Sequence, residues 1–515
     1  MSTTLKASGA ISLARPPAHP LRAKRLGVQT HQEAVVYMRT DCHVCRSEGL
    51  TPQSRVLLRN SGHEIIATLH QVESDLLDID QAGLSEIAWR RLAVEEGDLI
   101  YASHPNPVGS LGFVRRRIYG NRLDEAPLRA IIADIVKGSY SDVELSSFIT
   151  ACAALPLDKD ETIALTKAMV DVGEKLTWNR SPVVDKHSIG GLPGNRTTPI
   201  VVSIVAAHGL TMPKTSSRAI TSPAGTADTM ETMAPVNLDL PAIRRVVERE
   251  SGCIVWGGAV RLSPADDILI RIERALDIDS EGQLVASVLS KKIAAGSSHL
   301  VLDIPVGPTA KVRNVESASL LAKRLAEVAS AFGVHATMIV SDGMQPVGSG
   351  MGPALEARDV MAVLQGIPEA SAELRDRACT LAGALLELGG ACAEGLGKAL
   401  ALQTLEDGRA WAKFQRICEA QGGMRVPPIA RQQHPLVSPL AGVVTAIDNR
   451  RIARLAKLAG APESKAAGVH LAVQLGTHVS AGAPLCTVHA DTPGELHYAL
   501  DYAAANPDII EVAAA

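Results

Sequence analysis

Aromatic side chains, excess charge and long apolar runs are all scarce in this 515-residue chain. Phe, Trp and Tyr make up 3% of the residues, which leaves few platforms for stacking the bases of a single-stranded nucleic acid. The formal net charge is −4, so no basic field points to nucleic acid as a partner. No apolar run reaches the roughly 20 residues that a membrane-spanning helix needs. With 46% hydrophobic and 21% charged residues, the chain is expected to be soluble and globular.

A disulfide framework is missing as well. The eight cysteines are scattered apart from Cys42 and Cys45, which is typical of a reducing compartment, so we expect a cytoplasmic protein. No second ligand pair follows Cys42-His43-Val44-Cys45 at zinc-site spacing, and neither a metal nor a cofactor is expected. The first 32 residues lack Asp and Glu but hold five Lys or Arg, and a disordered N-terminus is favoured over a transit peptide.

The length predicts two to four domains. Residues 1–25, rich in Ala, Ser, Pro and Arg, are expected to be disordered. Residues 26–102 read as a small β-rich domain, in which Arg55–Arg59 and Glu64–Leu69 form a hairpin. Further elements of this domain are predicted at Val35–Met38, Leu99–Ala102 and, as a short helix, Ser85–Leu92.

Helical periodicity follows the linker His104–Pro107. Apolar residues recur at three- and four-residue spacing in Leu128–Val136 and Leu145–Ala154. Residues 183–340 alternate strands and helices, which argues for an α/β sheet. Residues 434–515 form another unit of short strands with glycine turns, and the last residues return to helix.

One glycine-rich segment has two interpretations. Gly348-Ser349-Gly350-Met351-Gly352 runs into a predicted helix at Pro353–Leu364, where proline suits the first helical position. As a nucleotide-binding fingerprint the segment is weak, and a plain turn from loop to helix is favoured.

Two other segments combine glycine, hydroxyl side chains and basic residues. They are Lys186-His187-Ser188-Ile189-Gly190-Gly191 and the stretch Lys214–Asp228. Glycine lets backbone N–H groups approach an anion, hydroxyls donate short hydrogen bonds, and Lys or Arg supplies charge. Two such loops close together in the sequence indicate one phosphate held from two sides.

These motifs carry a resemblance to a family. The Lys186–Gly191 loop and a second loop that ends in Gly225-Thr226 resemble the phosphate loops of the thymidine and pyrimidine-nucleoside phosphorylase family. Ser263-Pro264-Ala265-Asp266 and Ser287-x-x-Ser290-Lys291-Lys292 match the same family in the same order, over about residues 105–515. The N-terminal extension and its Arg39–Gly49 stretch resemble the long bacterial form, with archaeal AMP phosphorylase as a near relative.

The resemblance implies an α/β protein with the nucleoside phosphorylase fold. Its helical lobe would comprise residues 105–175 plus 262–295, and its mixed α/β domain residues 176–260 plus 298–430. Residues 434–515 would form the family's C-terminal α/β hammerhead. Family members dimerise through the helical lobe, so a homodimer or higher homo-oligomer is expected.

The reaction implied is phosphorolysis of an N-glycosidic bond. Thymidine or another pyrimidine nucleoside would react with inorganic phosphate, a co-substrate, to give the free base and (2-deoxy)ribose 1-phosphate. The alternative is an AMP phosphorylase-type reaction, in which a nucleoside 5′-monophosphate gives ribose 1,5-bisphosphate. Two remoter readings are a phosphoribosyltransferase, with Asp228 and Glu231 holding a metal, and a non-catalytic nucleotide-binding module.

The family pattern also implies roles for individual residues. Phosphate would be bound by one lysine and several hydroxyls, namely Lys186, Ser188, Ser216, Thr226 and, as a weaker candidate, Thr198. His187 matches a histidine that contacts the base or donates a proton. Asp279 matches the acid of AMP phosphorylases, a role that needs a raised carboxyl pKa; the alternative is a helix cap.

Further residues would contact the substrate. They are Gly191, Ser217, Arg218, Ala219, Ile220, Thr221, Ser222, Ser287, Lys291 and Lys311. Lys311 is a candidate for binding a 5′-phosphate. Glu273 stands where short-form enzymes place the Arg that binds the pyrimidine carbonyl, so base recognition departs from theirs.

Overall fold

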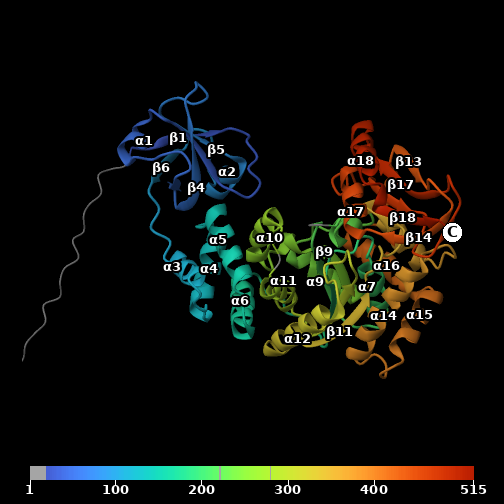
Figure 1. Ribbon diagram of the computed structural model, residues 1–515. Helices are drawn as coiled ribbons and strands as arrows, with labels where there is room; N and C mark the ends of the chain where they lie inside the picture. Colours follow the sequence, from blue (N-terminus) through green and yellow to red (C-terminus); the bar gives the residue numbers. More distant parts are fainter. Residues whose placement is uncertain (1–18, 220–221, 279, 515) are drawn as a thin grey trace, which may run out of the picture. The chain divides into compact units, whose positions relative to one another are not determined.

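The computed structural model describes residues 19–219, 222–278 and 280–514 (Figure 1). The chain divides into two compact units. The first runs to Arg115 and includes Asp134–Ser147, and the second comprises Arg116–Ala133 and Phe148 to the C-terminus. Within the described ranges, every helix is too short or too polar to cross a bilayer.

The first unit contains a closed six-stranded barrel. Its apolar interior includes Met38, Leu58, Leu69 and Ile100, all fully buried. The predicted hairpin is confirmed, and helix α2 (Glu86–Leu92) begins where Ser85 Oγ accepts a hydrogen bond from Ala88 N. In barrel order the strands are β1 (Leu21–Arg25), β5 (Gln81–Leu84), β2 (Val35–Arg39), β4 (His63–Val72), β3 (Arg55–Asn60) and β6 (Leu99–Ser103).

Strand β1 corrects the predicted extent of disorder. Leu21–Arg25 belong to the barrel, pairing in parallel with β5 and antiparallel with β6. Leu21 and Ala23 face the barrel interior, whereas the basic residues between and after them do not. Such a short alternating strand in a basic segment gains its stability from its two neighbours, which local composition does not reveal. Helix α1 (His43–Glu48), capped by Cys42, was likewise not predicted.

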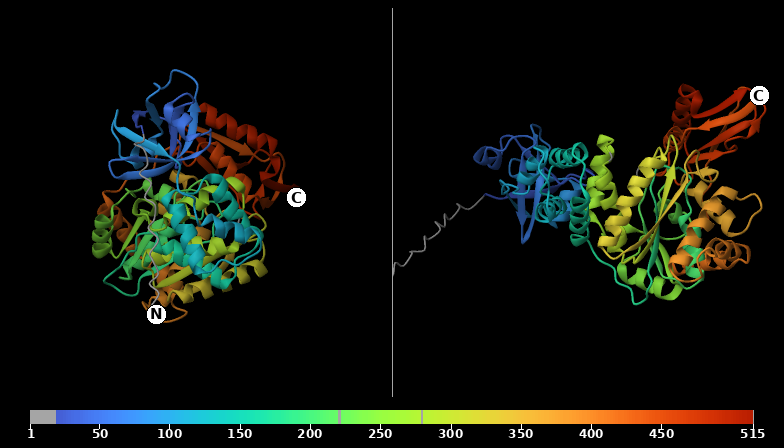
Figure 2. Two further views of the ribbon diagram at one scale, coloured as in Figure 1. Left: turned by 90° about the vertical axis from the view of Figure 1, so that its left-hand side faces the viewer. Right: turned by 60° about the horizontal axis from the view of Figure 1, so that its bottom comes forward.

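The second unit contains a parallel sheet that carries the candidate site. Strands β11, β10 and β7 form one part and β8 and β9 another, joined by a parallel bridge between Val183 and Thr211. Helices cover both faces (Figure 2), as expected for parallel strands. On β10, Leu300 and Leu302 pack toward α11 and α12, while Val301 packs toward α7 and α14. The strands are β7 (Val184–Ser188), β8 (Met212–Ser216), β9 (Gly252–Trp256), β10 (His299–Val306) and β11 (His335–Asp342).

Helices α7 (Thr198–Ala207), α9 (Leu240–Glu250) and α12 (Val315–Ala331) lie between these strands in the chain, in agreement with the alternation predicted for residues 183–340. Helices α14 (Ala372–Leu388) and α16 (Arg409–Gln421) also pack on the sheet, and α15 (Gly397–Glu406) packs on α14, α16 and α7. The ranges predicted for the helical lobe contain α3 (Leu111–Ile118), α4 (Glu125–Lys137), α5 (Asp142–Ala154), α6 (Lys159–Asp171), α10 (Pro264–Leu276) and α11 (Glu281–Ala294). Asp158 begins α6 with a capping box, in which its side chain and that of Glu161 each accept a backbone N–H of the other residue.

The C-terminal part is a pair of small sheets with two helices. A helix, α18, is present near the end of the chain, but strand β18 follows it, so the prediction that the last residues are helical is wrong. The elements are β13 (Gln432–Val437), β14 (Gly442–Ile447), α17 (Asn449–Leu458), β15 (Gly468–Leu471), β16 (His478–Val479), β17 (Pro484–Ala490), α18 (Pro493–Ala505) and β18 (Ile510–Ala514).

The glycine-rich segment 348–352 joins this part to the α/β domain. Its strand β12 (Gly350–Met351) pairs with β15, and helix α13 (Pro353–Leu364) follows directly. The backbone N–H groups of Ser349 and Gly350 donate to Asp359 Oδ2 at 2.8 and 2.7 Å. These donors are therefore used inside the protein, which favours the turn over a nucleotide-binding loop.

We expect Gly352→Ala to destabilise the protein. Gly352 has a φ of 134°, and an added Cβ would lie 2.2 Å from the carbonyl oxygen of Ala467. Strain and steric overlap should lower Tm by about 3–8 °C, measured by differential scanning calorimetry. Gly494→Ala is the matched control, because no atom lies within 4 Å of a Cβ there. Equal Tm values for the two variants would contradict this account.

Candidate active site

The predicted phosphate-binding residues converge at the carboxyl edge of the parallel sheet. Lys186, His187 and Ser188 end β7, and Ser216 ends the neighbouring strand β8. On the other side of β7, Asp303 of β10 stands in register with Ser188. Open α/β sheets bind ligands at this edge, because the loops that follow parallel strands meet there.

Lys186 is buried among hydroxyl groups. Its side chain is removed from solvent, and Nζ donates to Thr197 Oγ1 at 2.6 Å and to Ser188 Oγ at 3.1 Å. Burial lowers the pKa of Lys186 to about 8, with nearby Arg196 and Arg377 lowering it further and Asp303 and Asp185 opposing them. Thr197, rather than the predicted neighbour Thr198, supplies the hydroxyl that contacts this lysine.

Asp303 orients Ser188. Ser188 Oγ donates to Asp303 Oδ2 at 2.6 Å, and Ser341 donates to the other carboxylate oxygen. Arg377 in turn donates to Ser341 Oγ at 2.9 Å. The role of Asp303 was not predicted, although a carboxylate in a buried apolar strand is the signal that could have indicated it.

Thr226 is held by a buried arginine. Arg196 donates through one terminal nitrogen to Thr226 Oγ1 at 2.7 Å and through the other to the Ala224 carbonyl at 2.8 Å. Its Nε pairs with Glu356 Oε2 at 2.6 Å. Glu356 is fully buried on α13, so this chain of contacts ties the second loop to the body of the domain.

Ser216 differs from the other hydroxyls. Its Oγ is buried and has no hydrogen-bond partner among the residues that the structure describes. A buried hydroxyl without a partner is costly unless a ligand satisfies it. Together with the Lys186 cation and its hydroxyl partners, this orphan donor fits an anion such as phosphate.

Next to Lys186, the charged side chains of Asp185, Lys214 and Lys292 form a second cluster. The carboxylate of Asp185 pairs with Lys214 Nζ at 3.0 Å and with Lys292 Nζ at 2.8 Å, and it accepts the backbone N–H of Lys186 at 2.7 Å. Burial would raise the pKa of Asp185, but the two lysines outweigh burial and the pKa is lowered. Since Lys292 belongs to α11, this ion pair also fixes that helix against the site.

His187 lies in a positive environment. Burial lowers the pKa of its imidazole well below the ordinary value, and Lys292, Lys214, Lys291 and Lys186 lower it further. The ring is therefore neutral at pH 7. A neutral imidazole offers one N–H donor and one acceptor, so it can hydrogen-bond to a base but holds no spare proton to transfer.

The predicted base contacts Ser287 and Lys291 lie on α11, one turn apart. Lys291 Nζ pairs with Asp266 on α10 at 2.6 Å. The charge of Lys291 contributes to the lowered pKa of His187, which puts the base-side residues and the phosphate loop in one electrostatic environment. Glu273 and Arg271 both lie on α10.

The backbone of Lys311 is in contact with the first loop, Lys186–Gly191. Gly191 has a φ of 99°, and a Cβ there would lie 3.1 Å from Lys311 N, so the two segments are in contact. Asp279, Ile220 and Thr221 fall outside the described residues.

The remaining predicted residues of the second loop have internal partners. Arg218 pairs with Asp228 and Glu231, Ala219 N donates to Asp228, and Ser222 Oγ donates to the Ala224 carbonyl. Lys465 adds a second cation to Asp228 and Glu231. The carboxylates that the phosphoribosyltransferase reading assigns to a metal are thus engaged by an arginine and a lysine. Ser217 is exposed at the start of the loop.

Comparison with known proteins assigns the chain to a family. Residues 112–173 match a glycosyl transferase family helical bundle domain, 180–411 a glycosyl transferase family a/b domain, and 443–509 a pyrimidine nucleoside phosphorylase C-terminal domain. A protein of Chelativorans sp. (strain BNC1) is 62% identical over 98% of this chain and 99% of its own. The chain belongs to the thymidine and pyrimidine-nucleoside phosphorylase family. It is therefore a pentosyltransferase with the predicted α/β nucleoside phosphorylase fold.

Other relatives agree. A protein of Polaromonas sp. (strain JS666 / ATCC BAA-500) is 58% identical over 96% of this chain and 97% of its own, and both relatives carry the name "Putative thymidine phosphorylase". Anthranilate phosphoribosyltransferase from Thermus thermophilus superposes with a TM-score of 0.50 at 20% identity, covering 60% of this chain and 98% of that one. At that identity the likeness concerns the fold alone.

The neutral state of His187 leads to a prediction about its substitutions. His187→Asn keeps an N–H donor, whereas His187→Leu does not. We expect the asparagine variant to transfer the pentosyl group about tenfold faster than the leucine variant, the effect of one hydrogen bond. Steady-state kcat checks this. A wild-type kcat that falls as pH rises through 6–7, and loses this step in both variants, would show an imidazolium acting as acid instead.

Proposed function

We propose that this enzyme catalyses phosphorolysis of a pyrimidine nucleoside, with thymidine as the first candidate. Inorganic phosphate attacks the anomeric carbon of the sugar, the N-glycosidic bond breaks, and its electron pair leaves with the base. The products are the free base and (2-deoxy)ribose 1-phosphate. One observation carries the proposal: the buried Lys186 cation and its hydroxyl partners share the sheet edge with the unpartnered hydroxyl of Ser216.

The site residues suit the tasks of this reaction. Lys186, Ser188 and Ser216 would hold and aim the phosphate, with Thr226 approaching from the second loop. Little covalent work falls to the protein, so positioning and electrostatics supply the rate enhancement. The neutral His187 would donate its N–H to the departing base, whose negative charge the surrounding lysines stabilise.

A second candidate substrate is a nucleoside 5′-monophosphate. Lys311 supports it, because the backbone N and Cβ of this lysine lie against Gly191 of the first loop. In that case the sugar product would be ribose 1,5-bisphosphate.

The decisive experiment is an assay for free base. The full-length protein is incubated with thymidine, uridine, AMP, CMP and UMP, with and without inorganic phosphate, and the released base is measured by chromatography. We expect phosphate-dependent release of thymine. Release from monophosphates only, lost in Lys311→Ala, would favour the second candidate. No release from any substrate, with metal-dependent consumption of phosphoribosyl pyrophosphate, would contradict both.

Lys186→Ala tests the anion site itself. Removing the cation leaves the hydroxyls of Thr197 and Ser188 without their shared partner and the phosphate without its charge. We expect kcat/KM for phosphate to fall at least about a hundredfold, since a charged hydrogen bond in such a site is worth roughly 3 kcal/mol. Activity close to that of the wild type would refute the assignment.

The lowered pKa of Lys186 predicts a pH dependence. In the free enzyme Nζ loses its proton as pH rises through about 8, and with it the charge that binds phosphate. We expect kcat/KM for phosphate to fall by about tenfold per pH unit above that value. Lys186→Arg is the control, because arginine stays charged over this range. The same decline in both proteins would assign the titration to another group.

A further inference from the structure

The carboxylate of Asp228 connects two points of the second loop, the stretch Lys214–Asp228. Asp228 is buried, and its Oδ2 accepts the backbone N–H of Ala219 at 2.7 Å and that of Gly225 at 3.0 Å. Ala219 lies on the strand side of the loop, and Gly225 directly precedes Thr226. Asp228 therefore joins the two ends of the segment 219–225, which is flanked by the predicted phosphate-binding hydroxyls of Ser216 and Thr226.

Arg218 and Glu231 extend this contact. Arg218 donates to Asp228 Oδ1 at 3.0 Å and to both oxygens of Glu231 at 2.8 and 2.9 Å. Its guanidinium also stacks over Trp256, 5.0 Å from the ring centroid. The guanidinium group of Arg218 thus fixes the start of the second loop. Arg218 carries one positive charge, whereas Asp228 and Glu231 together carry two negative charges.

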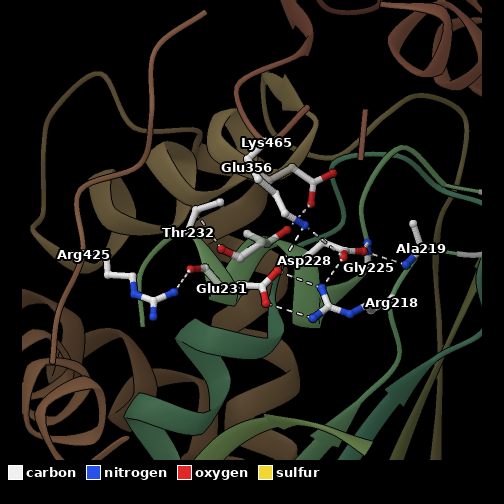
Figure 3. A network of polar contacts seen from close by, with 10 residues as sticks. Arg218, Ala219, Gly225, Asp228, Glu231, Thr232, Glu356, Arg425 and Lys465 are labelled. Carbon is white, nitrogen blue, oxygen red and sulfur yellow. Dashed lines mark hydrogen bonds and ion pairs between the residues drawn. The ribbon is translucent and has the colours of Figure 1, made fainter. Parts of the chain in front are cut away.

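The second cation comes from the C-terminal part of the chain. Lys465 Nζ lies 3.2 Å from Glu231 Oε2 and 3.5 Å from Asp228 Oδ1, and Figure 3 shows its side chain reaching toward this pair. Arg218 and then Lys465 outweigh burial and lower the pKa of Glu231 to about 2, so the acid is ionised. The side chains of Asp228 and Glu231 then face the two cations Arg218 and Lys465, and these four charges balance; Arg425 donates to the backbone carbonyl of Glu231 at 3.0 Å and is not counted among them.

The backbone of Lys465 is hydrogen-bonded to the start of helix α13. Its carbonyl accepts the N–H of Ala354 at 3.0 Å, at the start of α13. A few residues later β15 pairs with β12, with Met351 opposite Val469. The same helix α13 carries Glu356, the partner of Arg196, so both anchors of the second loop converge on one rigid element.

We propose that Lys465 is a positioning residue through which the C-terminal domain sets the affinity of the second loop for phosphate. Without its charge, Asp228 and Glu231 carry one uncompensated negative charge beside the loop that presents Ser216 and Thr226. That charge repels the phosphate dianion and weakens the contacts of Asp228 with the backbone of Ala219 and Gly225. The inference rests on the proposed function only for its assignment of phosphate to this loop.

Phosphate affinity of the full-length protein provides the test. Inorganic phosphate is titrated by isothermal calorimetry without nucleoside, against the wild type, Lys465→Met, Lys465→Arg and Arg450→Met. We expect Kd to rise about three- to tenfold in Lys465→Met, the effect of one partly screened charge. Lys465→Arg should restore most of the affinity. Arg450→Met removes an exposed cation of the same domain and should leave Kd unchanged.

Glu231→Gln tests the sign of the effect. It leaves the cluster with one excess positive charge, so Kd for phosphate should fall, which loss of stability would not produce. The double variant Lys465→Met/Glu231→Gln is balanced again and should bind phosphate more tightly than Lys465→Met. An unchanged Kd in Lys465→Met, or a double variant no better than the single one, would overturn the inference.

Two readouts separate this inference from the proposed function. In an active enzyme, Lys465→Met should raise KM for phosphate far more than it lowers kcat. If Kd shifts as expected but no base is released from any nucleoside, the proposed reaction fails and the role of Lys465 stands. If base is released and Kd for phosphate is the same in all variants, the role of Lys465 fails and the reaction stands.

Discussion

Three lysines, Lys186, Lys214 and Lys292, are buried where the parallel strands of the second unit reach their carboxyl ends. An unpaired ammonium group at such a depth would cost several kcal/mol, so each one meets oxygen atoms. Asp185 pairs with both Lys214 and Lys292, while the Lys186 ammonium group donates to the hydroxyls of Thr197 and Ser188, and Ser188 in turn donates to Asp303. This unequal pairing makes Lys186 the lysine whose charge is available to an incoming anion.

The same pairing sets the arrangement around it. Lys292 brings α11 and its neighbour Lys291 to the sheet edge, and burial, reinforced by the surrounding lysines, lowers the pKa of His187 so that its ring is neutral. On the opposite side, Arg196 and Glu356 connect the second loop to α13. A site for a phosphate and a leaving base thus follows from balancing buried charge rather than from any single catalytic group.

Much of the fold was predictable because its signals are local. Alternating strands, amphipathic helices, the Asp158 cap and the Gly-Pro entry to α13 each depend on a few neighbouring residues. Strand β1 was missed because only its partners stabilise it, and the end of the chain was misjudged because β18 depends on pairing with β14. For the site, the sequence indicated the loops Lys186–Gly191 and Lys214–Asp228. It did not indicate Thr197, Asp303 and Arg196, because their hydrogen-bond partners lie 11 to 160 positions away in the chain.

By itself the sequence determined the family, the order of the domains and the residue types that hold an anion, because glycine, hydroxyl and lysine at fixed spacing carry that chemistry locally. Only the tertiary structure decided which lysine is left to meet a ligand, which hydroxyl lacks a partner among the described residues and that His187 is neutral. Those properties depend on burial and on charges brought together from distant segments. The approach of Lys465 to Asp228 and Glu231 is of the same kind, since 237 and 234 positions separate residues whose side chains are in contact.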